Sequence, residues 1–501
     1  MRLPSTSGSF ALVYRAVPPT VRGWLASLYG AQSRRLRYGG SYARHLIEFR
    51  EHDSWSRERL VDWQNARLRD LLRHAVDKVP YYRRLHASGK FPIEQVRTVD
   101  DLVRLPLLEK EELRLRPDDF LASDPATLHQ YYTSGTTGTP VKLYRSTETI
   151  RAWYACFERR AREWAGVRLG DRFAALGGQL VVPFEQERPP FWVWNYAGQQ
   201  LYMSVYHLSG KHLDGYLDEL VRRRIVYIYG YASALDALAT HALERGRGDV
   251  SLRAAISNAE PLFEHQRERL QRAFGCAVRD TYVPSELTVG AFECEAAVMH
   301  QSMELGALEV IGTDGGRRDS GEPGELICTG LLNFDQVFIR YRQGDRGAVD
   351  DGRSGPCACG REGPRLVSIE GRQDDVLVTA DGRRIGRLDP VFKGGMAIRE
   401  AQIRQIAIDT IEVLVVPSQG YSDKDTQAIT TRLRERMGNV NVRVVQVDQL
   451  ERSANGKLRA VIGLPGPGSA EPATVSGAAI SGSGGPGPAG GRNTPGATPR
   501  S

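Results

Sequence analysis

Several features that would quickly assign a class of protein are missing from this chain of 501 residues. No apolar run reaches the roughly eighteen residues that a membrane-spanning helix requires. The semi-apolar segment 9–29 is interrupted by Arg15, Pro18, Pro19 and Arg22, so we expect neither a signal sequence nor a transmembrane helix there, and an amphipathic surface contact stays open. The sequence therefore predicts a cytoplasmic protein.

Short motifs that would mark a hydrolase are absent as well. The sequence contains neither a GxSxG nucleophile elbow nor an HExxH metalloprotease motif. His207, His241 and His265 are not paired with a Ser or Cys in a nucleophile motif, which argues against a Ser/His hydrolase. The Walker pattern, in which Lys is followed directly by Ser or Thr, is also missing.

The composition is that of an ordinary globular protein. Apolar residues make up 41% and charged residues 25% of a chain that is long enough for two or three domains. Lysine is scarce, and the net charge of +7 comes mostly from arginines that are interspersed with acidic residues. The triplet at 222–224 is typical of a solvated helix end, so we expect no nucleic-acid partner.

The most informative segment is residues 131–142 (Tyr-Tyr-Thr-Ser-Gly-Thr-Thr-Gly-Thr-Pro-Val-Lys). Glycine permits backbone angles that point successive N–H groups at an anion, and the hydroxyl groups add further donors. Lys142 adds a positive charge at the rim, so a polyphosphate, and hence a nucleotide, is the expected ligand. A flexible linker is the alternative, but linkers rarely lie between apolar flanks that carry tyrosines.

The middle of the chain alternates between strands and helices. Apolar periodicity also predicts earlier helices, the first of them ended by Pro80. Alternation at this spacing indicates a parallel sheet with helices on its faces, followed by a β-rich subdomain with Gly-rich turns. The expected helices are 56–76, 109–114, 147–165, 233–244 and 264–274; the expected strands are 225–229, 254–257, 277–279, 308–311, 325–329 and 337–341.

The fold class that follows is α/β plus α+β. We expect a large N-terminal domain, 1–373, whose β-rich subdomain spans about 305–370. A small mobile α+β domain follows at 374–464, with strands 376–379, 411–416 and 442–447 and helices near 399–408 and 425–437. The tail, 465–501, consists of Gly, Pro, Ser, Ala and Thr with almost no large apolar residue, so we expect it to be disordered.

Four further segments complete a pattern. They are residues 257–261 (Ser-Asn-Ala-Glu-Pro), 280–286 (Asp-Thr-Tyr-Val-Pro-Ser-Glu), 341–345 (Tyr-Arg-Gln-Gly-Asp) and 452–459 (Arg-Ser-Ala-Asn-Gly-Lys-Leu-Arg). With the loop at 133–142, they resemble in the same order the motifs of the adenylate-forming superfamily, the acyl-CoA synthetase and ligase type. Residues 79–82 (Val-Pro-Tyr-Tyr), 229–233 and 386–394 look most like the phenylacetate–CoA ligase branch, closest to its capsular-polysaccharide-associated members. The resemblance covers roughly residues 40–463.

The resemblance implies a role for individual side chains. Tyr282 would stack on adenine, Glu286 would help to hold Mg²⁺, and Asp345 would bind the ribose hydroxyls. Lys457 would neutralise charge on the transferring acyl phosphate, and Asp374 would be the hinge of the small domain. The implied catalytic residues are Lys457, Glu286 and Thr136, and the implied nucleotide-binding residues are Thr133, Ser134, Gly135, Thr137, Gly138, Lys142, Asn258, Ala259, Glu260, Tyr282, Asp345 and Arg372.

The implied reaction joins ATP to a carboxylic acid. The acid would attack the α-phosphate of Mg·ATP to give an acyl-AMP and pyrophosphate, and coenzyme A would then take the acyl group. Three alternatives stay open: transfer to an amine or hydroxyl (including AMP-ester formation), a silent nucleotide-binding scaffold, and a structural protein that binds zinc but no nucleotide. The acid and the oligomeric state stay open too, with a homodimer among the assemblies considered.

Three cysteines and one histidine form a second candidate site. Cys294 and His300 are six positions apart, and Cys357 and Cys359 are two apart. Three thiolates and one imidazole match a closed, structural zinc site, although by spacing alone free core cysteines and a surface histidine fit equally well. The same four donors occur in the phenylacetate–CoA ligase branch, so the resemblance implies a zinc that joins the β-rich subdomain to the loop after Glu286.

Overall fold

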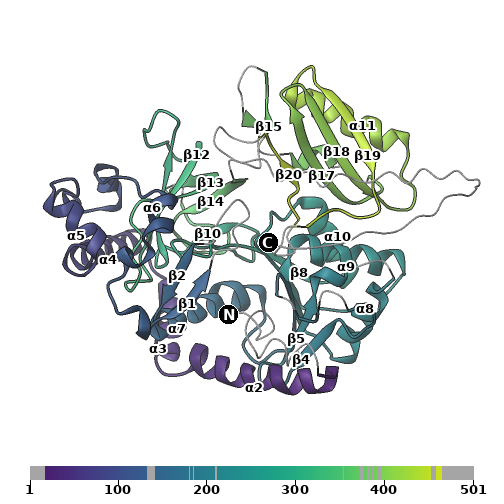
Figure 1. Ribbon diagram of the computed structural model, residues 1–501, viewed down its shortest axis with the longest axis horizontal. Coiled ribbons are helices and arrows are strands. Elements are labelled where there is room, and N and C mark those ends of the chain that lie inside the picture. The colour runs from purple at the N-terminus through teal and green to yellow at the C-terminus, as the bar shows by residue number, and fades with distance from the viewer. Residues whose placement is uncertain are drawn as a thin grey trace, which may run out of the picture. The chain divides into compact units, whose positions relative to one another are not determined.

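The computed structural model describes residues 17–132, 141–179, 181–183, 186–208, 211–353, 355–372, 377–380, 384–385, 388–392, 396–452 and 458–464 (Figure 1). The predicted tail, 465–501, lies outside these ranges. None of the described helices is both long and apolar enough to cross a bilayer.

A single twelve-stranded sheet runs through the large N-terminal part of the chain, in the order β11-β12-β13-β14-β10-β9-β8-β7-β6-β3-β5-β4. The predicted parallel sheet and β-rich region are thus continuous. The strands are β3 (Phe173–Gly177), β4 (Trp192–Asn195), β5 (Gln200–Ser204), β6 (Tyr227–Tyr231), β7 (Ala254–Asn258), β8 (Ala277–Tyr282), β9 (Ala291–Glu293), β10 (Met299–Gln301), β11 (Gly306–Ile311), β12 (Pro323–Gly330), β13 (Tyr341–Asp350) and β14 (Arg365–Arg372).

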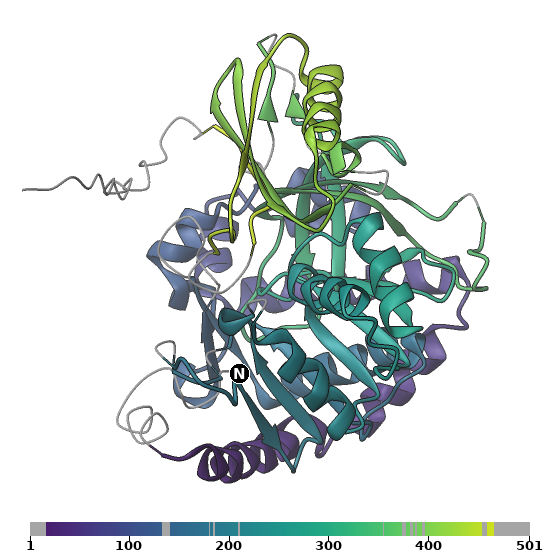
Figure 2. The same cartoon turned by 90° about the vertical axis from the view of Figure 1, so that its right-hand side faces the viewer.

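Strands β5, β3, β6, β7 and β8 are parallel, as the alternation predicts. The connecting helices are α8 (Leu213–Arg222), α9 (Ala232–Glu244) and α10 (Glu264–Phe274), and they pack along one side of these strands (Figures 1 and 2). Gly230 lets β6 approach β3 closely, because a Cβ at this position would lie 2.0 Å from the carbonyl oxygen of Leu176. From β9 to β14 the pairing is antiparallel.

The N-terminal helices are α2 (Pro19–Tyr38), α3 (Tyr42–His52), α4 (Arg57–Lys78), α5 (Pro80–Ala87) and α6 (Lys110–Leu115). The predicted apolar face of α4 is confirmed, since Leu68, Leu71, Leu72 and Ala75 are buried. Pro80 does more than end that helix, because it is the first residue of α5, a position where its missing N–H costs nothing. Helix α7 (Thr147–Phe157) continues through a π-helical turn, Glu158–Arg162, and a 3₁₀ turn, Glu163–Ala165.

A separate hairpin of β1 (His129–Tyr132) and β2 (Lys142–Arg145) flanks the phosphate-loop sequence. Further 3₁₀ turns are Ile93–Gln95, Val99–Arg104, Pro117–Phe120, Pro125–Thr127, Val205–His207 and Asp389–Phe392.

The C-terminal region contains a sheet in the order β19-β18-β17-β20, covered by α11 (Asp423–Met437). Its strands are β17 (Ile398–Ala407), β18 (Thr410–Pro417), β19 (Asn441–Gln446) and β20 (Val461–Ile462), with the small pair β15 (Leu377–Val378) and β16 (Arg384–Ile385) before them.

Two sequence predictions of secondary structure are wrong. The expected helix near 399–408 is strand β17, whose antiparallel pairing with β18 outweighs the helix preference of its Glu, Gln and Ala residues. The expected strand 337–341 begins only at Tyr341. Val337, Phe338 and Ile339 are buried in irregular backbone instead, where the Val337 N–H donates to Phe120 and the Ile339 N–H donates to the Tyr82 hydroxyl.

A buried ion pair joins the π-helical turn after α7 to the segment between β10 and β11. The carboxylate of Glu304 accepts hydrogen bonds from Arg160 at 2.6 Å and from Ser302 at 2.9 Å, and lies 3.0 Å from Nδ1 of His52. Burial alone would raise the pKa of Glu304, but Arg160 and His52 lower it to about 2. The carboxylate is therefore ionised in the folded protein.

We predict that Glu304→Gln lowers the free energy of unfolding by about 3 kcal/mol, because it removes the nearer of the two carboxylates that face the buried Arg160 and leaves only Asp53, at 3.6 Å. Since the folded pKa of about 2 lies below the ordinary value of 4.5, the stabilisation is present above pH 4.5 and is lost as the pH falls toward 2. Urea unfolding of both proteins across this range measures the difference.

The matched control is Glu48→Gln, which removes an exposed carboxylate 3.8 Å from Arg44 and should change stability by less than about 0.5 kcal/mol. A Glu304→Gln protein as stable as this control would contradict the prediction.

Candidate functional site

The β1–β2 hairpin holds together the two ends of the predicted phosphate loop. Tyr132, the last residue of β1, pairs with Lys142, the first residue of β2. The side-chain amide of Gln336 fixes β2 from the other side, because it donates to the Lys142 carbonyl and accepts from the Tyr144 N–H. Arg145 at the end of β2 donates to the carbonyl of Ser285. The hairpin is thereby connected to the loop that follows β8.

A cluster of polar groups brings two of the predicted motifs together. The Tyr282 hydroxyl donates to Oδ2 of Asp345 at 2.8 Å, and the amide of Gln343 donates to the same oxygen at 2.9 Å and to the Tyr282 oxygen. Burial raises the pKa of Tyr282 well above its usual value and the neighbouring Asp345 raises it further. The hydroxyl therefore stays protonated at neutral pH, and it keeps the Asp345 carboxylate in place.

Glu286 follows directly in the same loop. Its side chain is only 9% exposed, and its Oε1 accepts a hydrogen bond from Tyr341 at 3.2 Å. This contact fixes the carboxylate but leaves Oε2 outside the bond, so one hard oxygen could serve a cation together with phosphate oxygens and water.

The loop after β7 is the third segment that contributes residues to the candidate site. Asn258 ends β7 and pairs in parallel with Thr281 of β8, one residue before Tyr282. Within the described residues, Oδ1 of Asn258 is buried without a hydrogen-bond partner, and Ala259 adopts the left-handed region with φ of 62°. An unpartnered acceptor beside a strained turn fits the exocyclic amino group of an adenine.

Glu260 connects this loop to the C-terminal region. Its Oε2 accepts from the N–H of Ser233 at 2.9 Å, and its Oε1 accepts from the N–H of Leu458 at 2.7 Å. Arg452 donates to the Ser233 hydroxyl at 2.8 Å and forms an ion pair with Glu400. Arg452 and Leu458, the described residues on either side of 453–457, therefore both contact the large N-terminal region.

Several predicted site residues lie outside the described part of the chain. They are Thr133, Ser134, Gly135, Thr136, Thr137, Gly138, Asp374 and Lys457. Arg372 is described in its backbone alone, where it ends β14 and pairs with Asp345. Lys142 is described, with its Nζ 5.6 Å from the centre of the Tyr144 ring. The predicted residues that the structure does bring together are Asn258, Glu260, Tyr282, Glu286 and Asp345.

Three neighbours of these residues were not predicted as site residues: Arg145, Tyr341 and Gln343. A usable signal existed for two of them, because Tyr341, Gln343 and Asp345 alternate along one strand and so share a face. No pattern in the sequence marks Arg145, whose bond to Ser285 spans 140 positions.

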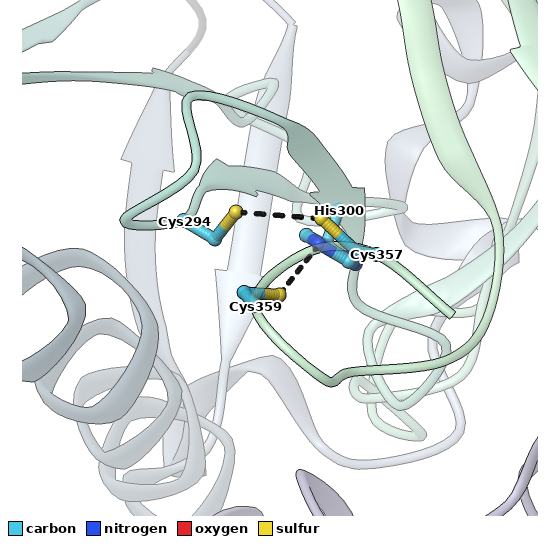
Figure 3. Close-up of side chains that lie close together, drawn as sticks. All are labelled: Cys294, His300, Cys357 and Cys359. Carbon is cyan, nitrogen blue, oxygen red and sulfur yellow. Dashed lines mark hydrogen bonds between the residues drawn. The ribbon is translucent and has the colours of Figure 1, made fainter.

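The four predicted metal ligands also lie together. Ligand atoms of Cys294, His300, Cys357 and Cys359 all fall within 4.8 Å of one another (Figure 3). The Sγ atoms of Cys294 and Cys357 are 4.0 Å apart, and Sγ of Cys359 is 3.4 Å from Nε2 of His300. These spacings resemble the edges of a tetrahedron around a metal with bonds of roughly 2.0–2.3 Å.

Electrostatics around the four side chains suit metal ligands. Burial and the nearby Arg361 lower the pKa of His300 to about 4, so its imidazole is neutral at pH 7, as a ligand must be. Burial raises the pKa of the Cys294 thiol to about 12. Without a cation this thiol stays protonated, and a bound cation would favour the thiolate.

Comparisons with known proteins agree with this geometry. Residues 32–337 match the family of AMP-binding enzymes, and residues 377–463 match the CapK C-terminal domain. The chain belongs to the AMP-binding enzyme family. Protein CapK of Staphylococcus aureus is 24% identical over 461 residues, which cover 90% of this chain and 98% of CapK.

Two coenzyme A ligases are also similar to this chain. The phenylacetate-coenzyme A ligase of Thermus thermophilus is 24% identical over 457 residues, covering 83% of this chain and 98% of the ligase. A crystal structure of 2-hydroxyisobutyryl-CoA ligase superposes with a TM-score of 0.65 at 21% identity, covering 82% and 91% of the two chains, which supports the fold. This AMP-binding enzyme is thus an adenylate-forming protein of the phenylacetate–CoA ligase branch, near CapK.

Proposed function

We propose that this protein activates a carboxylic acid with ATP and passes the acyl group to coenzyme A. In the first step a carboxylate oxygen attacks the α-phosphorus, the bond to the β-phosphate breaks, and pyrophosphate leaves. In the second step the thiolate of coenzyme A attacks the acyl carbon and AMP leaves. The observation that carries the proposal is the meeting of Tyr282 and Asp345, from motifs 63 positions apart, beside the hairpin that frames the phosphate loop.

Catalysis in such a site consists mainly of positioning and charge stabilisation. Asp345 would accept hydrogen bonds from the ribose while Tyr282 and Gln343 fix its orientation. Asn258 would accept from the adenine amino group, and the loop 133–142 would hold the β- and γ-phosphates. Bound Mg²⁺ would neutralise phosphate charge, and Glu286 is the carboxylate placed to hold it.

Lys457 is the proposed cation at the transferring centre. It lies in the segment 453–457, between Arg452 and Leu458, both of which contact the large N-terminal region. We propose that the domain 374–464 turns about Asp374 between the two steps, so that coenzyme A can enter after adenylation. ATP, coenzyme A and reduced thiols are all available in the cytoplasm, where we place the protein.

A second candidate function keeps the first step and changes the acceptor to an amine or a hydroxyl. The match of residues 377–463 to the CapK C-terminal domain is compatible with either acceptor. A screen of carboxylic acids, with and without coenzyme A, separates the two functions.

We predict acid-dependent exchange of labelled pyrophosphate into ATP, and a coenzyme A thioester as the product. Lys457→Ala should lower the exchange rate by about 10²–10³-fold, because it removes a positive charge that stabilises the transition state more strongly than the ground state. The same variant should still form the thioester from a supplied acyl-AMP. Absence of exchange with every acid tested would refute adenylation, and exchange without a thioester would favour the second function.

Glu260 is proposed to position Lys457 rather than to bind the nucleotide, since both of its oxygens are bonded to backbone N–H groups. Glu260→Gln replaces one acceptor by a donor, so we expect about a tenfold lower adenylation rate with unchanged ATP affinity and unchanged thioester formation. Pre-steady-state measurement of the two half-reactions tests this. Glu264→Gln, an exposed change nearby, is the control, and a loss of ATP affinity in Glu260→Gln would contradict the positioning role.

We also propose that Cys294, His300, Cys357 and Cys359 hold a structural Zn²⁺. With four protein ligands no coordination position is left for substrate, so the metal would connect the segment after β9 to the segment before β14. An ion pair of 2.7 Å between Arg361 and Glu295 joins the same two segments without a metal.

We predict one zinc per chain in the purified protein, measured by inductively coupled plasma mass spectrometry. Cys294→Ser should lose the metal and lower the melting temperature, while adenylation is retained because the ion pair still joins the segments. Cys276→Ser, which changes a buried cysteine outside the cluster, is the control for the effect of replacing any buried thiol by a hydroxyl. Unchanged zinc content in Cys294→Ser would refute the site.

A further inference from the structure

Helix α2 exposes a row of large apolar side chains. Val21 is 39% exposed, Trp24 is 68% exposed and Leu28 is 71% exposed. Because these residues follow one another at intervals of three and four, they lie on one face of the helix. We call this row, together with Tyr196, the α2 stripe.

The opposite face of α2 is fixed against β4, the edge strand of the large sheet (Figures 1 and 2). The hydroxyl of Ser27 accepts the Tyr196 N–H at 3.0 Å. A Cβ at Gly30 would lie 2.3 Å from the side chain of Asn195, so glycine allows this close approach. The helix therefore cannot rotate to bury the stripe without losing these contacts.

Tyr196, just after β4, widens the exposed surface. It is 53% exposed, and its ring stacks on Trp24 with centroids 5.8 Å apart. Tryptophan and tyrosine are the side chains that favour the boundary between lipid headgroups and acyl chains, because each combines an apolar ring with a polar group.

The charge around the stripe has a single sign along this part of the chain. No Asp or Glu occurs before Glu48, whereas arginines occur at positions 2, 15, 22, 34, 35, 37 and 44. Arg34 and Arg35 are exposed in the C-terminal half of α2, and Arg34 donates to the Ala197 carbonyl beside Tyr196. Arg222 and Arg223 share the single carboxylate of Glu219, which leaves one positive charge in addition to those of α2.

We propose that the α2 stripe binds the surface of a membrane with anionic headgroups. The apolar side chains would enter the headgroup region while Arg34 and Arg35 meet the phosphates, as in other basic amphipathic helices that lie on bilayers. A second copy of the chain suits this face less well. A second copy of the chain carries the same positive charge on α2 and therefore offers Arg34 and Arg35 no complementary charge.

The test is co-sedimentation of the full chain with vesicles of phosphatidylcholine, with and without phosphatidylglycerol. We expect binding to the anionic vesicles that weakens as salt is added, and little binding to neutral ones. Trp24→Ser with Leu28→Ser should reduce the partition coefficient by about tenfold or more. Arg35→Ser should reduce it by about fivefold.

The matched control is Leu115→Ser with Ile406→Ser. These residues are 69% and 58% exposed but lie on α6 and β17, so their replacement should leave vesicle binding unchanged. All substituted residues are exposed, and circular dichroism with a melting curve confirms folding of each variant.

Four outcomes would overturn the proposal. One is no binding to anionic vesicles, and another is equal binding to neutral vesicles. The third is a concentration-dependent dimer in analytical ultracentrifugation without lipid that disappears in the Trp24→Ser, Leu28→Ser protein, which would assign the stripe to a second copy. Binding that persists in that variant counts against the stripe in the same way.

Discussion

The two-sided pairing of β8 is the constraint on which the site depends. This strand pairs in parallel with β7 on one side and antiparallel with β9 on the other, so it joins the parallel half of the sheet to the antiparallel half. Its last residue is Tyr282, which stands where the direction of pairing changes. Ligands of open α/β sheets bind beyond the carboxyl ends of the parallel strands, and Tyr282 stands at that end of β8. Asn258 ends β7 and Glu286 follows β8, whereas Asp345 contacts Tyr282 from within β13.

Buried charges hold the elements behind this edge. The π-helical turn after α7 directs Arg160 toward Glu304 and Arg162 toward Glu158, at 2.6 Å and 2.8 Å. Breaking a buried pair leaves an uncompensated charge in the interior, so such pairs strongly disfavour other arrangements of the same helices. Arg160 and Arg361 also surround His300, and the charge network therefore extends from α7 to the cysteine cluster.

Sequence patterns predicted the local elements well where propensity and packing agree. Helix α10 has the predicted bounds, 264–274, and the parallel strands follow from continuous β-branched and aromatic residues. The prediction failed at β17, because Gln402 and Gln405 favour a helix locally while a partner strand decides the outcome. The prediction of a strand at 337–341 failed for a related reason, since this apolar run is buried against helices and is not paired with a neighbouring strand.

The candidate site likewise combines contacts that local sequence patterns predict with contacts that only tertiary folding produces. Motif order predicted Tyr282, Glu286 and Asp345 as site residues, and alternation in β13 explains why Tyr341 and Gln343 lie beside them. The bond from Arg145 to Ser285, and the contact of Glu260 with Leu458, arise only from tertiary folding. Nothing in the local sequence specifies them, because each joins segments more than a hundred positions apart.

The pairing of Tyr132 with Lys142 has a consequence for the energetics of ligand capture. In a free chain, bringing together two residues that are separated by nine others lowers the entropy by an amount that grows slowly with the length between them. Here that loss occurs when the hairpin forms, during folding, and not when a nucleotide arrives. The intervening glycines and hydroxyl residues can therefore vary in number with little effect on folding, whereas the strands at both ends fix the two ends of the loop proposed to hold the polyphosphate.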